Sequence, residues 1–511
     1  MRKINIKVAL ASLLLLGGMS LMGCSSSDDK IEVPDTPENP DKPDTPDTPD
    51  EPDEDPYNTP SEVKYKTFKG LAMCGYQGWQ TVPGDSHDSR SWTHWQANGC
   101  GKFEPGYSTV EYWPDMSEYT KTYETPFKYR DGSTAVIYSA SDYETVNLHF
   151  KWMKQYGIDG AIVQRFKSAV EATKNGDTHS VKVFENCLKA AKENGVAVML
   201  EYDMSGLRST EGDDVLQMIS DDWNKLNEAY HLTDPKECPQ YVWEKGKPLV
   251  GFYALGMNRQ DKDADGNGIG NSATPEQYEK IFAGMEGRDN VKGEVSILAG
   301  TGYYWLLNKK DAPANNSDAL AFEDWENLYK KVAVISPWAV GRYSSKAGFA
   351  NHEAQVKQEA QWCKENGVVY APVSFPGFSW RNLQTSWNRE GTEYSLDASN
   401  KYDACPRLRG KFLWYQMGNY KQWGANALFI AMFDEVDEGT AIYKCAHKDR
   451  TPWNYNEYNP QGKFLSYEDD IDTGYYMYLV GQAAQWMKGD KGDYNGYYNP
   501  NDPPVQTVVV K

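Results

Sequence analysis

The apolar residues of this chain gather in eight short, unbroken runs, each followed by a polar or aromatic patch and then by a helical pattern. Unbroken runs are typical of strands that are covered on both faces, as in a parallel sheet, whereas half-exposed strands alternate. The predicted strands are residues 70–76, 160–164, 196–202, 249–255, 295–300, 332–338, 368–373 and 427–433.

Stretches with helical periodicity separate these runs, at residues 140–157, 180–195, 352–367 and 473–489. The first of them has an N-cap near Ser141 and a stop at Gly157. Repeated strand–helix units predict an α/β fold, a (β/α)8 TIM barrel with long loops that occupies residues 63–511. A doubly wound open sheet is the alternative. The segment CGYQGW after the first strand lacks a third glycine and does not open a helix, so no nucleotide cofactor is expected.

The N-terminal 24 residues have the pattern of a lipoprotein signal peptide. A basic stretch and an apolar run precede the sequence LMGC, which resembles the lipobox of bacterial lipoproteins and predicts acylation at Cys24. An ordinary signal peptide is the alternative. The predicted location is the outer membrane or cell surface, with the periplasmic face as an alternative, and the membrane contact is through the lipid alone.

Residues 25–62 are predicted to be a disordered tether, because they hold nine prolines and carry a net charge of −12 with almost nothing apolar. The remaining residues 63–511 carry −11, so the folded part is also acidic and nucleic acid is not an expected partner. The seven cysteines after Cys24 are scattered, without a CxxC pair, and are predicted to be mostly buried, although one disulfide is allowed. The protein is expected to be a monomer.

Active sites of such barrels lie at the C-terminal ends of the strands, where this chain places aromatic, acidic and amide side chains. Sugars offer apolar C–H faces and rims of hydroxyls, so this mixture predicts a carbohydrate-binding cleft. Packing between barrel and helices is the competing explanation for each aromatic residue. The candidate substrate-binding residues are Tyr76, Trp79, Trp92, His94, Trp95, Arg165, Glu201, Asp203, Trp305, Arg342, Trp380, Arg381, Asn382 and Asp434.

Two of these candidates have an explicit structural alternative. His94 could make a structural hydrogen bond, and Arg165 could pair with an acidic neighbour and not with the substrate.

Four carboxylates follow the last strand within five positions, in the sequence FDEVDEGT. Crowded like charges raise each other's pKa, and such groups are candidates for acid/base chemistry. Glu435 and Glu438 are therefore the predicted catalytic pair, with a solvated acidic turn as the alternative.

The same stretch resembles the glycoside hydrolase family 71/99-like proteins, which include the endo-α-mannosidases and endo-α-mannanases of family 99. The matching residues are Phe433, Asp434, Glu435, Glu438, Gly439 and Thr440, and the segments GLAMCGYQGW, SWTHW, GIDGAIVQRF and PGFSWRN are also similar. The resemblance covers most of residues 65–490. Where family 99 usually reads N-E-W-H-E-G, this chain has Asp434, Val436 and Asp437.

The resemblance implies that Glu438 is the general acid and that Glu435 is a base that takes the proton of the sugar 2-hydroxyl, with net retention. The residues alone leave a glutamate nucleophile or an inverting water equally open. A pKa raised on Glu438 and not on Glu435 is the expected sign of the acid. The predicted function is hydrolysis of an α-linked glycan, mannan-like or glucan-like, without a metal; a non-catalytic glycan-binding surface lipoprotein is the alternative.

One further acidic motif, DKDADGNGIGNS, matches the pattern of the first half of a calcium-binding loop through Asp261, Asp263 and Asp265. Ser272 stands at the twelfth position, where such loops have glutamate. A solvated insertion after the fourth strand is the preferred interpretation.

Overall fold

The computed structural model describes residues 55–258, 272–307, 318–397, 399–489 and 499–506. Its central feature is a sheet with the strand order β10-β9-β8-β7-β5-β4-β1-β14-β11, in which all neighbours along this path run parallel. The strands are β1 (Ala72–Tyr76), β4 (Gly160–Phe166), β5 (Ala197–Asp203), β7 (Lys247–Leu255), β8 (Ser296–Thr301), β9 (Val334–Pro337), β10 (Val369–Tyr370), β11 (Val373–Ser374) and β14 (Leu428–Ile430).

The sheet closes on itself through one interrupted strand. β10 pairs with β9, and β11 pairs with β14, while Ala371 and Pro372 separate the two pieces. β10 lies within the predicted run 368–373 and β11 begins at its last residue, while Pro372 has no N–H with which to continue a ladder. Taken as one strand, they complete a circuit of eight parallel strands, which confirms the (β/α)8 barrel and excludes the open sheet.

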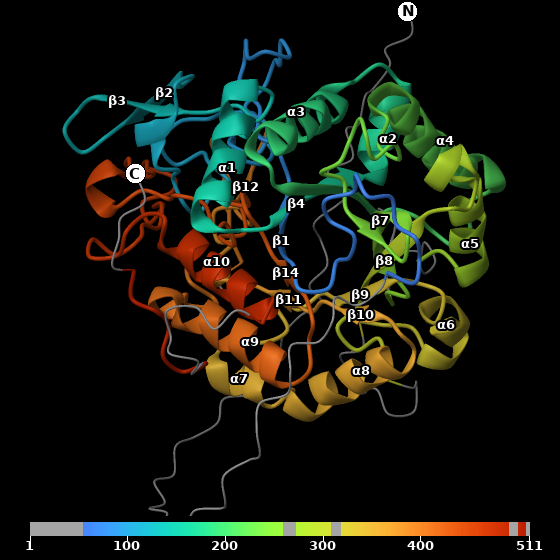
Figure 1. Cartoon of the computed structure of the whole chain (residues 1–511). Coiled ribbons are helices and arrows are strands. Elements are labelled where there is room, and N and C mark those ends of the chain that lie inside the picture. The colour runs from blue at the N-terminus through green and yellow to red at the C-terminus, as the bar shows by residue number, and fades with distance from the viewer. Residues whose placement is uncertain (1–54, 259–271, 308–317, 398, 490–498, 507–511) are drawn as a thin grey trace, which may run out of the picture. The chain divides into compact units, whose positions relative to one another are not determined.

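Helices cover the outside of the barrel (Figure 1). The first begins after the N-cap Asp142 and ends at Gly157, which adopts the left-handed conformation that glycine tolerates (φ 80°), so both predicted ends hold within one residue. The helices are α1 (Tyr143–Tyr156), α2 (Lys167–Lys174), α3 (His179–Asn194), α4 (Asp213–Tyr230), α5 (Pro275–Gly284), α6 (Phe322–Tyr329), α7 (Lys346–Ala350), α8 (Glu353–Glu365), α9 (Lys411–Gln422) and α10 (Tyr475–Met487).

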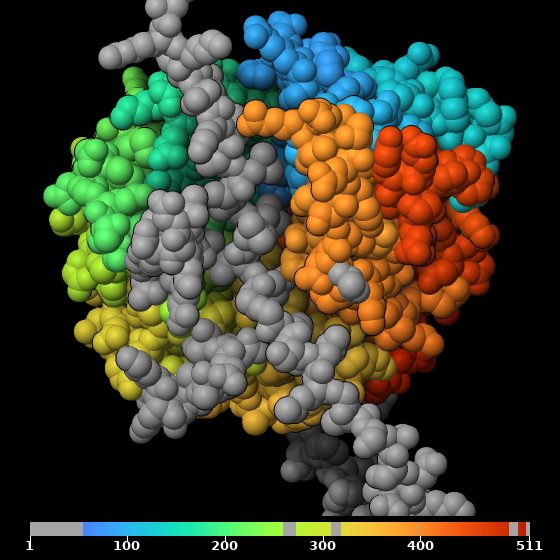
Figure 2. Space-filling view, turned by 180° about the vertical axis from the view of Figure 1, so that it is seen from behind, coloured from blue at the N-terminus to red at the C-terminus, as the bar shows by residue number. Residues whose placement is uncertain are grey.

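Three long connections follow strand ends on one side of the barrel: the β1 loop (77–142), the β11 loop (375–410) and the β14 loop (431–474). They lie side by side in Figure 2, in blue to cyan, orange and red. The β1 loop carries the hairpin β2 (Tyr123–Lys128) and β3 (Thr134–Ile137), and the β11 loop carries β12 (Ser386–Trp387) and β13 (Tyr394–Ser395). A short β6 (Trp243–Glu244) pairs antiparallel with β7.

The cysteines of the described residues are free thiols, and six of the seven are buried, as predicted; the disulfide that the sequence allowed is not formed among them. The part of the chain with described structure contains no helix that is both long and apolar enough to cross a bilayer. Cys24, most of the predicted tether, and Asp261, Asp263 and Asp265 lie outside the described residues.

Candidate active site

The acidic turn, residues 434–438, follows β14 at the C-terminal end of the barrel and is tied to the end of β1. Asp434 accepts hydrogen bonds from the backbone N–H groups of Gln77 and Gly78, both at 2.8 Å, and its carbonyl accepts one from Gln80 Nε2 at 3.1 Å. Burial raises the pKa of Asp434 to about 6, although the backbone N–H groups oppose the shift. Asp434 therefore anchors the turn to the neighbouring strand and is not open to a ligand.

Glu435 is buried inside the turn. Its Oε1 atom accepts the backbone N–H groups of Asp437 at 2.7 Å and of Glu438 at 3.1 Å. Burial raises the pKa of Glu435 well above its usual value, and the nearby carboxylates of Asp437, Glu438 and Asp434 add to the shift. The two backbone donors fix the orientation of this carboxyl.

Glu438 differs from the other carboxyls of the turn because it is partly exposed. None of the described residues forms a hydrogen bond with its carboxyl group, although its backbone carbonyl accepts the N–H of Ser379 at 2.9 Å. Enough protein surrounds the side chain that burial raises its pKa to about 7, and Asp437 adds to this shift. The expectation that only Glu438 would have a raised pKa is wrong, because Glu435 is buried more deeply among the same charges.

A stacked group of rings stands beside the turn. His94 Nδ1 lies 2.7 Å from Asp437 Oδ2, and Thr109 Oγ1 donates to the other oxygen of that carboxylate at 2.9 Å. The imidazole stacks on Trp79 with a centroid distance of 3.8 Å, and Phe166 stacks near Trp79 at 5.7 Å. Trp79 thus stacks with both rings, and all three side chains are partly exposed.

No protein-family model and no curated protein matches the sequence. Among solved structures, a GH99 endo-alpha-mannosidase from Bacteroides thetaiotaomicron matches with a TM-score of 0.53 and 16% identity, over 83% of this chain and 99% of that chain. A structure of that bacterium's GH99 endo-alpha-mannosidase in complex with bis-tris-propane matches with a TM-score of 0.51 and 16% identity, over 83% and 98%. The chain has the same (β/α)8 fold as these two structures. At this identity the likeness establishes the fold alone.

The remaining predicted aromatic residues divide by burial. Trp92 and Trp380 are half-buried, beside Phe103 and Phe378 respectively. Tyr76, Trp95 and Trp305 are fully buried. The Tyr76 hydroxyl is hydrogen-bonded to His149, and the other two rings pack edge-on against aromatic neighbours. These three side chains belong to the core, and the packing alternative holds for them.

The three predicted arginines all have partners within the protein. Arg165 is buried and binds Asp222 through Nε at 2.7 Å and Nη2 at 2.5 Å, so it is the partner of an acidic neighbour and not a substrate clamp. Arg342 forms an ion pair with Asp318 at 2.9 Å. The remaining predicted arginine, Arg381, donates to the hydroxyls of Tyr402 and Tyr394.

Glu201 and Asp203 lie at the end of β5. Gln164 Nε2 donates to Glu201 at 2.5 Å, and Asp203 accepts the N–H of Ser205 at 2.8 Å. Burial raises the pKa of Glu201 to about 8, opposed by the bond from Gln164 and supported by the charge of Asp203. A Cβ atom at Gly251 would lie 2.7 Å from Glu201 Cβ, so glycine is required there to admit this side chain.

Sequence reasoning missed Glu111, which is buried in the β1 loop. It accepts hydrogen bonds from Ser379 Oγ at 2.6 Å and from the backbone N–H of Asn382, while its own N–H donates to Val436 O at 2.7 Å. Burial raises its pKa to about 8, although these donors and Arg381 oppose the shift. A lone acid inside the apolar stretch TVEYW was the available signal.

Glu111 therefore links all three long loops. The backbone N–H of Ser379 donates to the carbonyl of Glu438, which connects Glu111 to the acidic turn. Asn382 donates through Nδ2 to Val110 O and Lys463 O, so Asn382 is a structural residue. Within the described parts of the chain, no group of three or more histidine, cysteine, aspartate or glutamate side chains has the geometry to hold a metal ion.

Proposed function

We propose that the protein is a glycoside hydrolase that cleaves an α-linked glycan or polysaccharide, mannan-like or glucan-like. One observation carries the proposal. A single turn at the C-terminal end of the barrel strands pairs two carboxyls: Glu438 is partly exposed and has no hydrogen bond from the described residues, and Glu435 is buried and held by two backbone N–H groups. Glycosidic cleavage needs two carboxyl groups in different environments.

In the proposed reaction, Glu438 is the general acid. Because its pKa is raised to about 7, Glu438 is protonated in a large fraction of the molecules near neutral pH. It can then protonate the leaving oxygen as the glycosidic bond breaks. Glu435 is the proposed base. The backbone N–H groups of Asp437 and Glu438 favour its ionised form and oppose the burial that raises its pKa. Following the resemblance to family 99, it takes the proton of the 2-hydroxyl, the 2-oxygen bonds to C1, and water then opens this intermediate with retention.

The test is turnover by purified protein on a panel of α-mannans, α-glucans and plant and host glycans. Glu435→Gln and Glu438→Gln should each abolish product release, while Glu468→Gln, an exposed glutamate of the same loop, should not. Equal inactivity of wild type and variants across the panel would remove the support for hydrolysis. Unchanged binding without any product would favour the non-catalytic, glycan-binding alternative.

We also propose that the chain is lipid-anchored through Cys24 at the outer membrane or cell surface. Labelled palmitate should be incorporated into the full-length wild-type protein and not into Cys24→Ala. Protease added to intact cells should digest the anchored protein if it faces outward, and resistance to protease would indicate the periplasmic face.

A further inference from the structure

The segment 452–459 of the β14 loop, the aromatic loop, reverses the usual distribution of apolar and polar side chains. Trp453, Tyr455 and Tyr458 are 46%, 51% and 40% exposed, while Asn454 and Asn459 of the same segment are buried. Large exposed rings are costly to leave in water, and buried amides are costly unless they are bonded. A cluster of exposed rings is typical of a surface that binds a ligand or a partner.

The asparagines show that this arrangement is built into the loop. Asn454 Oδ1 accepts the N–H of Gly106 at 2.9 Å. Asn456 Oδ1 accepts the N–H groups of Tyr458 at 3.0 Å and Asn459 at 2.7 Å. The amides fix the backbone against the β1 loop, so the rings next to them in sequence are held outward.

The hairpin β2–β3 positions the first ring. The Arg130 guanidinium stands 3.9 Å above the Trp453 ring, and its Nε donates to Lys448 O at 2.6 Å. Because the arginine covers one face, the exposed area of Trp453 lies on its remaining surface. Tyr455 meets Trp453 at 5.7 Å with an interplanar angle of 75°, so the two rings form an open corner.

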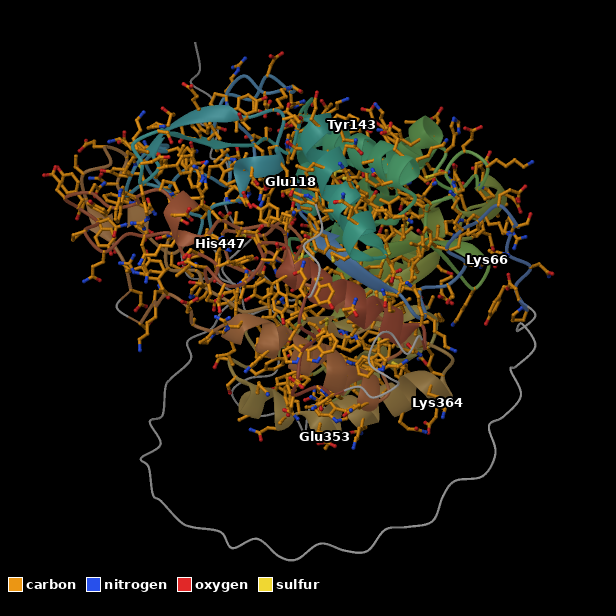
Figure 3. All side chains as sticks on the ribbon, turned by 60° about the vertical axis from the view of Figure 1, so that its left-hand side comes forward. Lys66, Glu118, Tyr143, Glu353, Lys364 and His447 are labelled. Carbon is orange, nitrogen blue, oxygen red and sulfur yellow. The ribbon has the colours of Figure 1, made fainter. Side chains whose placement is uncertain are left out.

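The aromatic loop lies at the same end of the barrel as the acidic turn, because it belongs to a connection that follows a strand end. Figure 1 shows the β14 loop next to the hairpin β2–β3, and Figure 3 labels His447 just before this segment, near Glu118. Asn382 Nδ2 donates to Lys463 O at 2.9 Å and thereby joins this part of the loop to the network around Glu438.

We propose that Trp453 and Tyr455 form an accessory binding site for a carbohydrate chain, separate from the acidic turn. Sugar rings can stack on the two aromatic faces while their hydroxyls meet the polar groups beside the rings, Arg130 and the backbone. Two rings interrupted by amides and charges form a smaller apolar surface than a protein partner requires. The choice of a glycan as ligand rests on the proposed function.

The test uses the full chain in the Glu438→Gln background, so that the polymer stays intact. Affinity electrophoresis in gels containing each polysaccharide of the panel should show retardation that falls about tenfold or more when Trp453 and Tyr455 are both changed to alanine. Tyr57→Ala, which removes another exposed ring (48%), is the matched control and should keep full retardation. Thermal melting should be unchanged, because the rings make few buried contacts.

Retardation that survives the double substitution would overturn the accessory site, as would absence of retardation in every gel. A double variant that loses binding only to phospholipid vesicles would also overturn it, because the loop would then meet a lipid surface. Retardation that depends on the two rings, in a wild-type protein that releases no product, would support the accessory site while contradicting the proposed hydrolysis.

Discussion

Acidic side chains crowd the ends of two strands, β14 and β5, and the two clusters are built differently. Glu201 at the end of β5 is bonded by Gln164 and lies against Gly251. At the end of β14, Glu435 is bonded in a similar way by the backbone, yet the same turn leaves the carboxyl of Glu438 without a hydrogen bond from the described residues.

The comparison shows that a raised pKa does not by itself identify a catalytic acid. Burial raises the pKa of Glu201 to about 8 and that of Glu438 to about 7, so the two groups titrate alike. They differ in exposure and in bonding: Glu201 is buried with a side-chain donor, whereas Glu438 is partly exposed and its carboxyl accepts no hydrogen bond from the described residues. A proton donor must reach its acceptor, and this favours Glu438.

The largest expected effect belongs to Glu438→Gln. Removing a general acid lowers the rate by about 10²- to 10⁴-fold, and the loss should be small for a glycosyl fluoride, whose leaving group needs no proton. Glu435→Gln should lose both activities, because the base or nucleophile is needed for either substrate. The measurement is kcat for the glycan and for the fluoride.

Equal losses on both substrates for Glu438→Gln would contradict its assignment as the acid. If Glu435→Gln were the variant rescued by the fluoride, the two roles would be reversed.

A smaller effect is expected from changing a residue that only positions the acidic turn. Ser379→Ala removes the hydroxyl that donates to Glu111, next to the backbone N–H that holds Glu438. The carboxyl should then be placed less accurately, and kcat should fall about tenfold with little change in KM. Ser386→Ala, an exposed serine of the same loop, is the control. A rise in KM at constant kcat would contradict a positioning role.

Asp437→Asn should shift the pH dependence of kcat/KM and keep both Glu435 and Glu438. The Asp437 charge raises the pKa of Glu438, so its removal lets Glu438 lose its proton at lower pH. The alkaline limb of kcat/KM, expected near pH 7 in the wild type, should move down by on the order of one pH unit. An unmoved or raised limb would show that Asp437 does not act on the acid.

The barrel strands and the acidic turn could be predicted from local sequence. Unbroken apolar runs predicted all eight barrel strands, and crowding predicted the acidic turn. The roles of loop residues could not be anticipated, because their partners lie far away in sequence: Arg165 meets Asp222, and Glu111 meets Ser379 from 268 residues away. Trp95 lies in a loop, yet it is fully buried, because the β1 loop folds on itself and packs Phe103 and Tyr138 against this ring.

The smallest expected effect on turnover belongs to Glu201→Gln, whose main consequence should be for stability. With a pKa of about 8 in the fold against 4.5 ordinarily, Glu201 holds a proton in the folded state that it loses on unfolding between these values. The free energy of unfolding should therefore fall as pH rises from about 4.5 to 8, by at most about 1.4 kcal/mol per pH unit for this group. Glutamine should remove that part of the slope in urea denaturation at pH 5 and pH 7.5. If Glu201→Gln instead abolished turnover as completely as Glu438→Gln, the β5 cluster would be part of the catalytic machinery.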